Sequence, residues 1–181
     1  MISELFPAYF YKFKSKDECD VLIRPLTPND ENLILEFFYE LSDETKYYRF
    51  LYWKSSISRK EVKQYTNIDY ENNFTLGAVI EVKDKNGKLR EKVIGVAQFF
   101  RDLTDYVVAE MAVVVIDEWQ GKGCGSQLLK NLITIAKHKG IQWIIGLTLS
   151  QNDVVCNILK RFGHKIYIET SKGIISFKFR I

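Results

Sequence analysis

Cysteine and histidine are scarce in this sequence, and their scarcity excludes several kinds of site. The 181 residues include three cysteines, Cys19, Cys124 and Cys156, and two histidines, His138 and His164. The cysteines are odd in number and lack the close spacing of a zinc site, so we expect neither a disulfide framework nor a bound metal. Unpaired cysteines of this kind favour a reducing, cytoplasmic location.

Long apolar runs and a strong charge of one sign are also missing. No stretch reaches the roughly 18 apolar residues of a transmembrane helix, and the N-terminus lacks the basic-then-apolar order of a secretory signal. The net charge of +3 is too small to favour nucleic acid. We therefore expect neither a membrane nor a nucleic acid as a partner. The chain is expected to be either a monomer or a homodimer.

The length of 181 residues predicts one domain over residues 1–181, with 1–18 as an N-terminal extension packed on it. Strand and helix signals alternate along the chain. The predicted order is a strand, one long and two short helices, three strands, a helix, a strand, a helix and two strands. This order predicts an α/β fold with helices on the faces of a mixed sheet.

Two helix starts carry capping signals. Thr27 and Asp30, with Pro28 between them, form a box-like start before an apolar stripe. Ser150 and Asp153 have the same spacing before a later predicted helix. Two hairpin turns are also marked, at Asn86-Gly87 and at Lys172-Gly173.

Three glycines stand where a predicted strand, 106–116, meets a predicted helix: Gly121, Gly123 and Gly125. Each costs about 0.5–1 kcal/mol relative to alanine inside regular structure. Their presence therefore favours a function of bare backbone N–H groups at a helix N-terminus, which is a site that binds phosphate. A tight turn without a ligand is the alternative.

Two common phosphate-binding turns do not fit these glycines. A P-loop requires GxxxxGK followed by Ser or Thr, and this spacing is absent. A dinucleotide turn requires GxGxxG, whereas Ser126 stands at the third glycine position. The next predicted strand, IQWIIGLTL, also lacks the acidic residue that would hold a ribose.

The stretch QGKGCG resembles the acetyl-CoA-binding motif of the GNAT (Gcn5-related N-acetyltransferase) superfamily, Arg/Gln-x-x-Gly-x-Gly/Ala, through Gln120, Gly123 and Gly125. Asn152 and Gly163 resemble the family's next motif, an asparagine that opens a helix ending at a glycine eleven residues later. The resemblance spans nearly the whole chain. It implies the GNAT fold, a mixed, mostly antiparallel sheet that splays in the middle and carries helices on both faces.

The N-terminal half is similar to one branch of this superfamily. FPAYFYKF, IRPLTPND, FFYELSDETKYYRF, YTNIDYENNFTLGAVI and AEMAVVV resemble the acetyltransferase domain of Pat-type protein lysine acetyltransferases. This implies that residues 47–50 lie near the acceptor cleft, although we slightly favour core aromatics with a paired Arg49 and Asp69. An acidic patch of Asp69, Glu71 and Glu110 would help a lysine to dock.

The resemblance also implies which residues hold acetyl-CoA, the cosubstrate. The turn over 120–126 offers N–H groups to the pyrophosphate, and the strand over 111–115 pairs with the pantetheine amides as an added strand would. Asn152 binds the cofactor through its amide or only caps its helix, Lys122 adds charge or is solvated, and Cys124 is small filler. The implied set is Met111, Val113, Val115, Gln120, Gly121, Lys122, Gly123, Cys124, Gly125, Ser126 and Asn152.

Two residues are expected to be catalytic. The backbone N–H of Val113 is the oxyanion donor that the resemblance implies. Glu110 is a carboxylate in an apolar strand, where an unpaired buried charge is costly. An amine of pKa about 10.4 must lose a proton at pH 7, at roughly 4–5 kcal/mol, and Glu110 could accept it. The alternative for Glu110 is a structural ion pair.

The leaving thiolate has no expected acid, because Leu159 occupies the position where many GNAT enzymes carry a tyrosine. Since a thiol has a pKa near 8.5, water can protonate the thiolate afterwards.

We predict direct transfer of acetyl to a protein lysine. A small amine or a protein N-terminus is the alternative acceptor, and a non-catalytic acyl-CoA sensor or a Rossmann dehydrogenase are alternatives of other classes.

Overall fold

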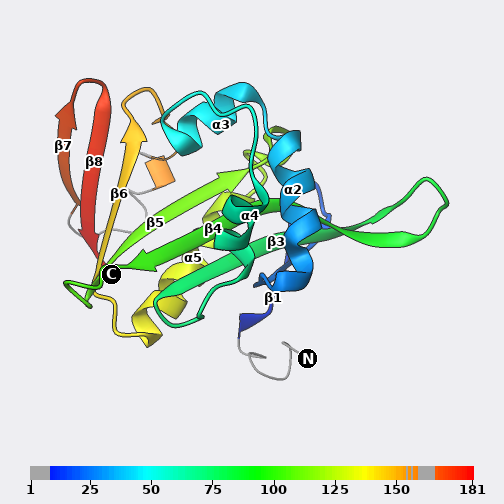
Figure 1. Ribbon diagram of the computed structural model, residues 1–181, viewed down its shortest axis with the longest axis horizontal. Coiled ribbons are helices and arrows are strands. Elements are labelled where there is room, and N and C mark those ends of the chain that lie inside the picture. The colour runs from blue at the N-terminus through cyan, green and yellow to red at the C-terminus, as the bar shows by residue number, and fades with distance from the viewer. Residues whose placement is uncertain (1–8, 154, 156, 159–165) are drawn as a thin grey trace.

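In the computed structural model, residues 9–153, 155, 157–158 and 166–181 can be described. Within them one eight-stranded sheet has the order β1-β2-β3-β4-β5-β6-β8-β7, antiparallel except between β5 and β6 (Figure 1). The strands are β1 Tyr11–Lys14, β2 Asp20–Pro25, β3 Asn73–Lys83, β4 Leu89–Arg101, β5 Val108–Val115, β6 Trp143–Leu149, β7 Ile166–Ser171 and β8 Ile174–Arg180. The α/β, mostly antiparallel architecture is confirmed.

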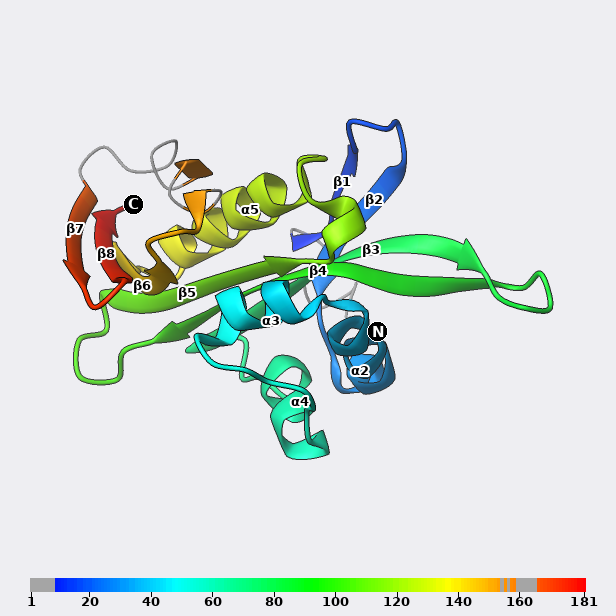
Figure 2. The same ribbon diagram turned by 90° about the horizontal axis from the view of Figure 1, so that it is seen from above.

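Helices cover both faces of the sheet. Figure 2 shows α5 on one face and α2, α3 and α4 on the other. The α-helices are α2 Glu31–Glu40, α3 Asp43–Phe50, α4 Arg59–Thr66 and α5 Cys124–His138, and the short 3-10 turns are η2 Pro28–Asp30 and η3 Asp117–Trp119. A Cβ on Gly95 of β4 would lie 3.0 Å from Leu128 Cδ1, so α5 packs closely on the middle of the sheet. No helix in these described ranges is long and apolar enough to cross a membrane.

The predicted helix start at Thr27 is confirmed. The Thr27 hydroxyl and the Asp30 carboxylate form a capping box, with Pro28 at the first position, although this first turn is the 3-10 turn η2. Ile34, Phe37 and Phe38 on α2 are buried, as their spacing predicts. The sequence did not predict β1, which lies inside the expected N-terminal extension and pairs with β2.

Both predicted hairpins are present. The β3–β4 hairpin extends well beyond the rest of the molecule (Figure 1), and Asp84 Oδ1 accepts N–H bonds from Asn86 and Lys88 in its turn. Lys172 and Gly173 join β7 to β8 with φ angles of 49° and 79°. Positive φ at both central residues matches the right-handed twist of the two strands.

The second predicted capping box is wrong. Asn152, not Ser150, caps the helical turn that includes residues 153, 155, 157 and 158, because its Oδ1 accepts the Val155 N–H at 3.2 Å. The Ser150 N–H instead donates to the Gly173 carbonyl. Gly163, the expected end of this helix, lies outside the described residues, as does Leu159.

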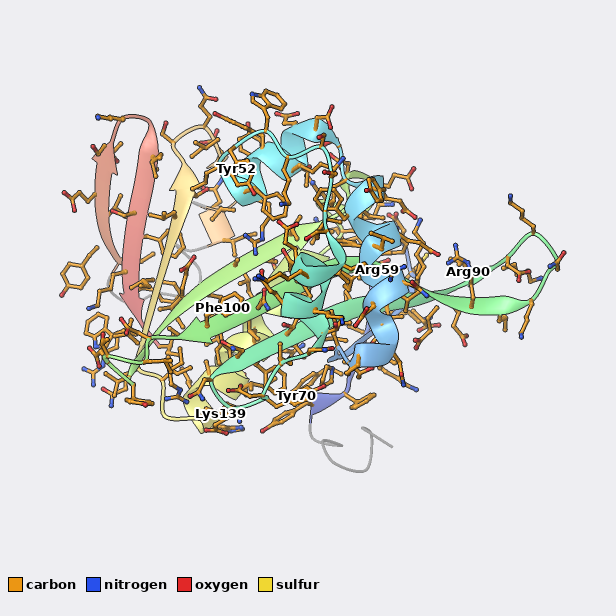
Figure 3. All side chains as sticks on the ribbon, viewed as in Figure 1. Tyr52, Arg59, Tyr70, Arg90, Phe100 and Lys139 are labelled. Atoms are coloured by element: carbon orange, nitrogen blue, oxygen red, sulfur yellow. The ribbon has the colours of Figure 1, made fainter. Side chains whose placement is uncertain are left out.

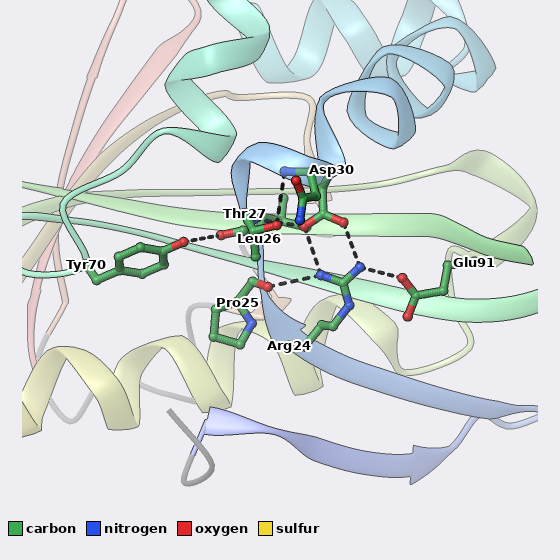
Figure 4. A network of polar contacts seen from close by, with 8 residues as sticks. Arg24, Pro25, Leu26, Thr27, Asp30, Tyr70 and Glu91 are labelled. Atoms are coloured by element: carbon green, nitrogen blue, oxygen red, sulfur yellow. Dashed lines mark hydrogen bonds and ion pairs between the residues drawn. The ribbon is translucent and has the colours of Figure 1, made fainter. Parts of the chain in front are cut away.

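A buried ionic network ties β2 to η2 and to the base of the long hairpin (Figure 4). Arg24 donates from both terminal nitrogens to Asp30, at 2.8 and 2.9 Å, and also to Glu91 at 2.6 Å. Asp30 accepts in addition from the Thr27 N–H at 2.8 Å. The IRPLTPND motif therefore serves the fold rather than the reaction.

The Asp30→Asn substitution tests this network. Burial alone raises the pKa of Asp30, but hydrogen bonds and charge from Arg24 outweigh it and hold the pKa below its usual value. We expect the free energy of unfolding of the variant to fall by roughly 2 kcal/mol at pH 7. This loss is smaller than the roughly 3–5 kcal/mol of a fully broken buried ion pair, because Glu91 still bonds Arg24.

The same network predicts a pH dependence. Because the pKa of Asp30 is lower in the folded chain, its contribution is complete above the unfolded carboxyl pKa of about 3.9 and is lost as the pH falls below it. Urea unfolding should therefore show a difference between parent and variant that shrinks below about pH 4. Asp20→Asn, in an exposed pair with Lys14, is the control and should change stability by under about 1 kcal/mol.

Candidate active site

The sheet forks between β5 and β6. The two strands pair in parallel only from Val108–Trp143 to Glu110–Ile145, while β6 continues its pairing with β8 as far as Leu149. Figure 1 shows the two ribbons diverging from this point. Beyond Glu110, β5 has lost its neighbour on that side, which confirms the splayed sheet.

The backbone of β5 presents polar groups to the fork. The Ile116 N–H donates to the Ile94 carbonyl at 3.0 Å, in register with the β4–β5 ladder. Because N–H and C=O groups alternate sides along a strand, those of Met111, Val113 and Val115 point away from β4 and toward the fork. The Val115 carbonyl accepts from Gln120 Nε2 at 3.1 Å, and the ladder with β6 ends at Glu110–Ile145, so the Met111 carbonyl, both backbone groups of Val113 and the Val115 N–H are available to an extended ligand.

A cleft of about 1030 Å³ occupies the fork and continues to the glycine-rich turn. Val113 and the neighbouring β5 residues line its wall, and Gly121, Gly123, Gly125 and Ser126 line the turn. Gly146 of β6 lies beside β5, since a Cβ there would be 3.1 Å from the Met111 carbonyl oxygen and 2.5 Å from Phe177 Cζ. Only glycine permits this close approach at the fork.

The turn leaves the N-terminus of α5 free for an anion. Gly121 and Gly123 have φ angles of 72° and 96°, and Gly123 caps α5 without any side-chain hydrogen bond. A Cβ on either glycine would meet no atom within 4 Å. Exposed N–H groups at the positive end of a 15-residue helix suit a phosphate group.

Two residues of the turn do not line the cleft. Lys122 pairs with Asp17 at 2.5 Å and lies over the Trp119 ring at 5.2 Å. Cys124 is fully buried, and burial raises the pKa of its thiol. Cys124 is thus the small filler expected from the sequence, and the Lys122 side chain braces the β1–β2 loop.

Polar contacts brace the turn against α3. The Asp117 carboxylate accepts from the Ser42 N–H at 3.0 Å, the Ser42 hydroxyl at 2.7 Å and the Thr45 hydroxyl at 2.8 Å. Burial alone raises the pKa of Asp117, but these hydrogen bonds outweigh it and lower that pKa. Gln120 Nε2 donates to Thr45 Oγ1 and to the Val115 carbonyl, each at 3.1 Å. These contacts fix the turn relative to β5.

Glu110 lies in the cleft at the last paired position of the fork. The sequence suggested a buried carboxylate, but the side chain is exposed, because the fork opens beside it. No hydrogen bond or ion pair reaches Glu110 from any residue that the structure describes. The alternative of a structural ion pair is therefore wrong within the described chain, and the carboxylate is free to meet an acceptor.

The expected acidic patch does not form. Asp69 accepts backbone N–H groups from residues 71, 72 and 73 of its own loop. Glu71 pairs at 2.8 Å with Lys139, which is labelled in Figure 3, and the Lys139 ammonium lies over the Phe74 ring of β3. Neither lines the cleft, so Glu110 contributes its charge there without them.

The aromatic helix α3 contributes more to the cleft than the favoured interpretation allowed. Tyr48, Arg49 and Phe50 line it, and Arg49 does not pair with Asp69. Asn152 also lines it while capping its helical turn. The sequence did not predict Lys16 as a cleft residue: its N–H donates to the Lys122 carbonyl at 3.2 Å, and it lines the cleft. No local signal marks Lys16, because the β1–β2 loop reaches the turn only through the tertiary fold.

The class of protein follows from the forked sheet and from a family match. Residues 20–165 match the sequence profile of the acetyltransferase (GNAT) domain. The chain belongs to this family and is an N-acetyltransferase. GNAT acetyltransferases use acetyl-CoA, and the described residues include no group of three or more His, Cys, Asp or Glu placed to hold a metal ion.

Two related proteins and one solved structure agree with this assignment to the GNAT family. The chain is 29% identical over 143 residues to Acetyltransferase PA5475 of Pseudomonas aeruginosa, covering 79% of this chain and 74% of that protein. It is 29% identical over 157 residues to Acetyltransferase Pat of Mycolicibacterium smegmatis, covering 84% of this chain but 43% of that protein. The GNAT domain of S. lividans PAT has the same fold, with a TM-score of 0.83 at 24% identity over 96% of this chain and 98% of that one.

Proposed function

We propose that this chain transfers acetyl directly from acetyl-CoA to the side-chain amine of a protein lysine. The observation that carries the proposal is the unpaired, exposed Glu110 carboxylate at the point where β5 and β6 separate. The similarity of the N-terminal half to Pat-type enzymes supports a protein lysine as the acceptor. A cytoplasmic location, favoured by the unpaired cysteines, is part of the same proposal.

Different residues along the cleft bind different parts of acetyl-CoA. The uncapped N–H groups of α5 and the ammonium of Lys16 hold the diphosphate end of the cofactor. The outward-facing backbone groups of Met111, Val113 and Val115 pair with the pantetheine amides. Acetyl-CoA would supply an activated acetyl thioester, and Val113 and Glu110, which both line the cleft, are the residues that would meet that group.

The reaction then needs a base for the amine proton and a hydrogen-bond donor for the carbonyl oxygen. Glu110 takes the proton of the incoming amine, whose nitrogen bonds to the acetyl carbon as the carbon–sulfur bond breaks. The Val113 N–H stabilises the negative charge that develops on the carbonyl oxygen. The thiolate leaves and takes a proton from water, since Leu159 stands where related enzymes carry a tyrosine.

Labelled acetyl-CoA tests the choice of acceptor. The purified chain is incubated with it and a cell lysate, and modified positions are mapped by mass spectrometry. We expect label on lysine side chains of specific proteins. Label confined to free small amines, or to protein N-termini, would overturn the protein-lysine assignment while leaving the acetyltransferase activity intact.

A further inference from the structure

A second, smaller cavity adjoins the active-site cleft. Its volume is about 220 Å³, and it lies between the end of α3, helix α4 and strand β4. Tyr52 and Phe100, both labelled in Figure 3, are among its lining residues. Arg49 and Phe50 line both cavities, so the two share a wall.

This cavity lies on the Glu110 side of the sheet. Phe100 is directly opposite Glu110 in the β4–β5 ladder, and opposed residues of a ladder project from the same face. The face is the one that α4 covers, because Gln98, two residues before Phe100, donates to the Gln64 carbonyl at 2.7 Å. An amine beside Glu110 is therefore next to the small cavity.

The charges of the cavity do not cancel. Lys54 and Glu61 form an ion pair, and Glu61 also accepts from the Ser58 N–H and hydroxyl. The hydrogen bonds from Lys54 and Ser58 lower the pKa of Glu61 to about 2, so this pair remains ionised and neutral overall.

Arg49 carries the remaining charge among the residues that line the small cavity. Its guanidinium lies over the Phe50 ring at 5.2 Å, and no described residue gives it a hydrogen bond or an ion pair. A half-buried guanidinium without an anionic partner is costly and offers several unused N–H donors. A ligand that supplies an anion at this wall would satisfy them.

We propose that Arg49 binds a carboxylate carried by the acceptor, the side chain of an aspartate or glutamate close to the reactive lysine. The inference rests on the proposed function and narrows its substrate class. The planar guanidinium group can donate two parallel hydrogen bonds to a carboxylate. Glu110 would receive the lysine amine and Arg49 would bind the carboxylate of the acceptor. The opposite charges of Glu110 and Arg49 therefore set the orientation of the acceptor in the cleft.

Paired peptides test the assignment on the full chain. Each peptide contains one lysine and a single glutamate at a successive position on either side of it, with a glutamine peptide as its match. We expect the parent to prefer glutamate at one position or more by roughly tenfold to a hundredfold in kcat/KM. Arg49→Gln should lower kcat/KM for the glutamate peptide by that factor and for the glutamine peptide far less. Arg49→Lys should retain part of the preference.

Arg59→Gln is the matched control. Arg59 lies on α4 (Figure 3), and its guanidinium donates to Asn32 Oδ1 at 2.9 Å, away from both cavities. This variant should keep the parental preference. Equal kcat/KM for glutamate and glutamine peptides in the parent would overturn the inference, and so would an equal loss on both peptides, or weaker acetyl-CoA binding, in Arg49→Gln. A parent that acetylates small amines but no lysine peptide would instead reject the proposed function, and the inference with it.

Discussion

Replacing Glu110 with glutamine should lower kcat by roughly 10²- to 10⁴-fold while the Kd for acetyl-CoA stays near the parental value. The substitution keeps size and hydrogen bonding but removes the group that takes the proton of the amine. The side chain is exposed and has no partner among the described residues, so the fold loses no contact with it. Steady-state kinetics with a lysine peptide and calorimetry with acetyl-CoA measure the two quantities separately.

A pH profile separates loss of a base from general damage. Without Glu110 the reaction depends on amine that is already neutral, and this fraction rises about tenfold per pH unit below the lysine pKa of about 10.4. The variant should therefore regain activity between about pH 7 and 9 more steeply than the parent. Glu169→Gln on β7, an exposed carboxylate outside both cavities, serves as the control. Parental turnover in Glu110→Gln would remove the assignment.

The elements of this fold could be predicted because their signals are local. The capping box at Thr27 and the turn at Asn86-Gly87 involve residues within a few positions of one another, and both are present. The strand β1 was missed, because its pairing with β2 depends on a neighbour rather than on a strong pattern of its own. Local competition also decided the later cap, where Asn152 displaced Ser150.

The site could be predicted only as far as its motif. The residues Gln120–Ser126 mark the turn, but the sequence could not show that the fork exposes Glu110. Nor could it show that Asp117 braces α3 through Ser42 and Thr45, about 70 positions away along the chain. Such contacts belong to the tertiary arrangement, and they set which side chains of the motif face the cleft and which, like Lys122, face away.

Gly123 and Gly125 form a matched pair for testing the phosphate turn. Gly123→Ala places a side chain at a φ of 96°, which costs about 1–2 kcal/mol, well below the stability of an ordinary domain. The new methyl group would stand in the open cleft, with no atom within 4 Å. It would therefore obstruct a ligand rather than the protein, and we expect the Kd for acetyl-CoA to rise by roughly 10²-fold, about the loss of one or two charge-assisted hydrogen bonds.

Gly125→Ala should behave oppositely, although the two glycines are two residues apart. Gly125 lies in the first turn of α5 without a positive φ, and its Cβ would make only an ordinary 3.6 Å contact with Val115 Cγ2. Alanine favours the helix, so stability should rise by up to about 1 kcal/mol with acetyl-CoA affinity near that of the parent. Calorimetry and urea unfolding measure both effects. Equal affinities in the two variants would mean that the backbone at position 123 does not hold the cofactor, and the anion site would have to lie elsewhere in the cleft.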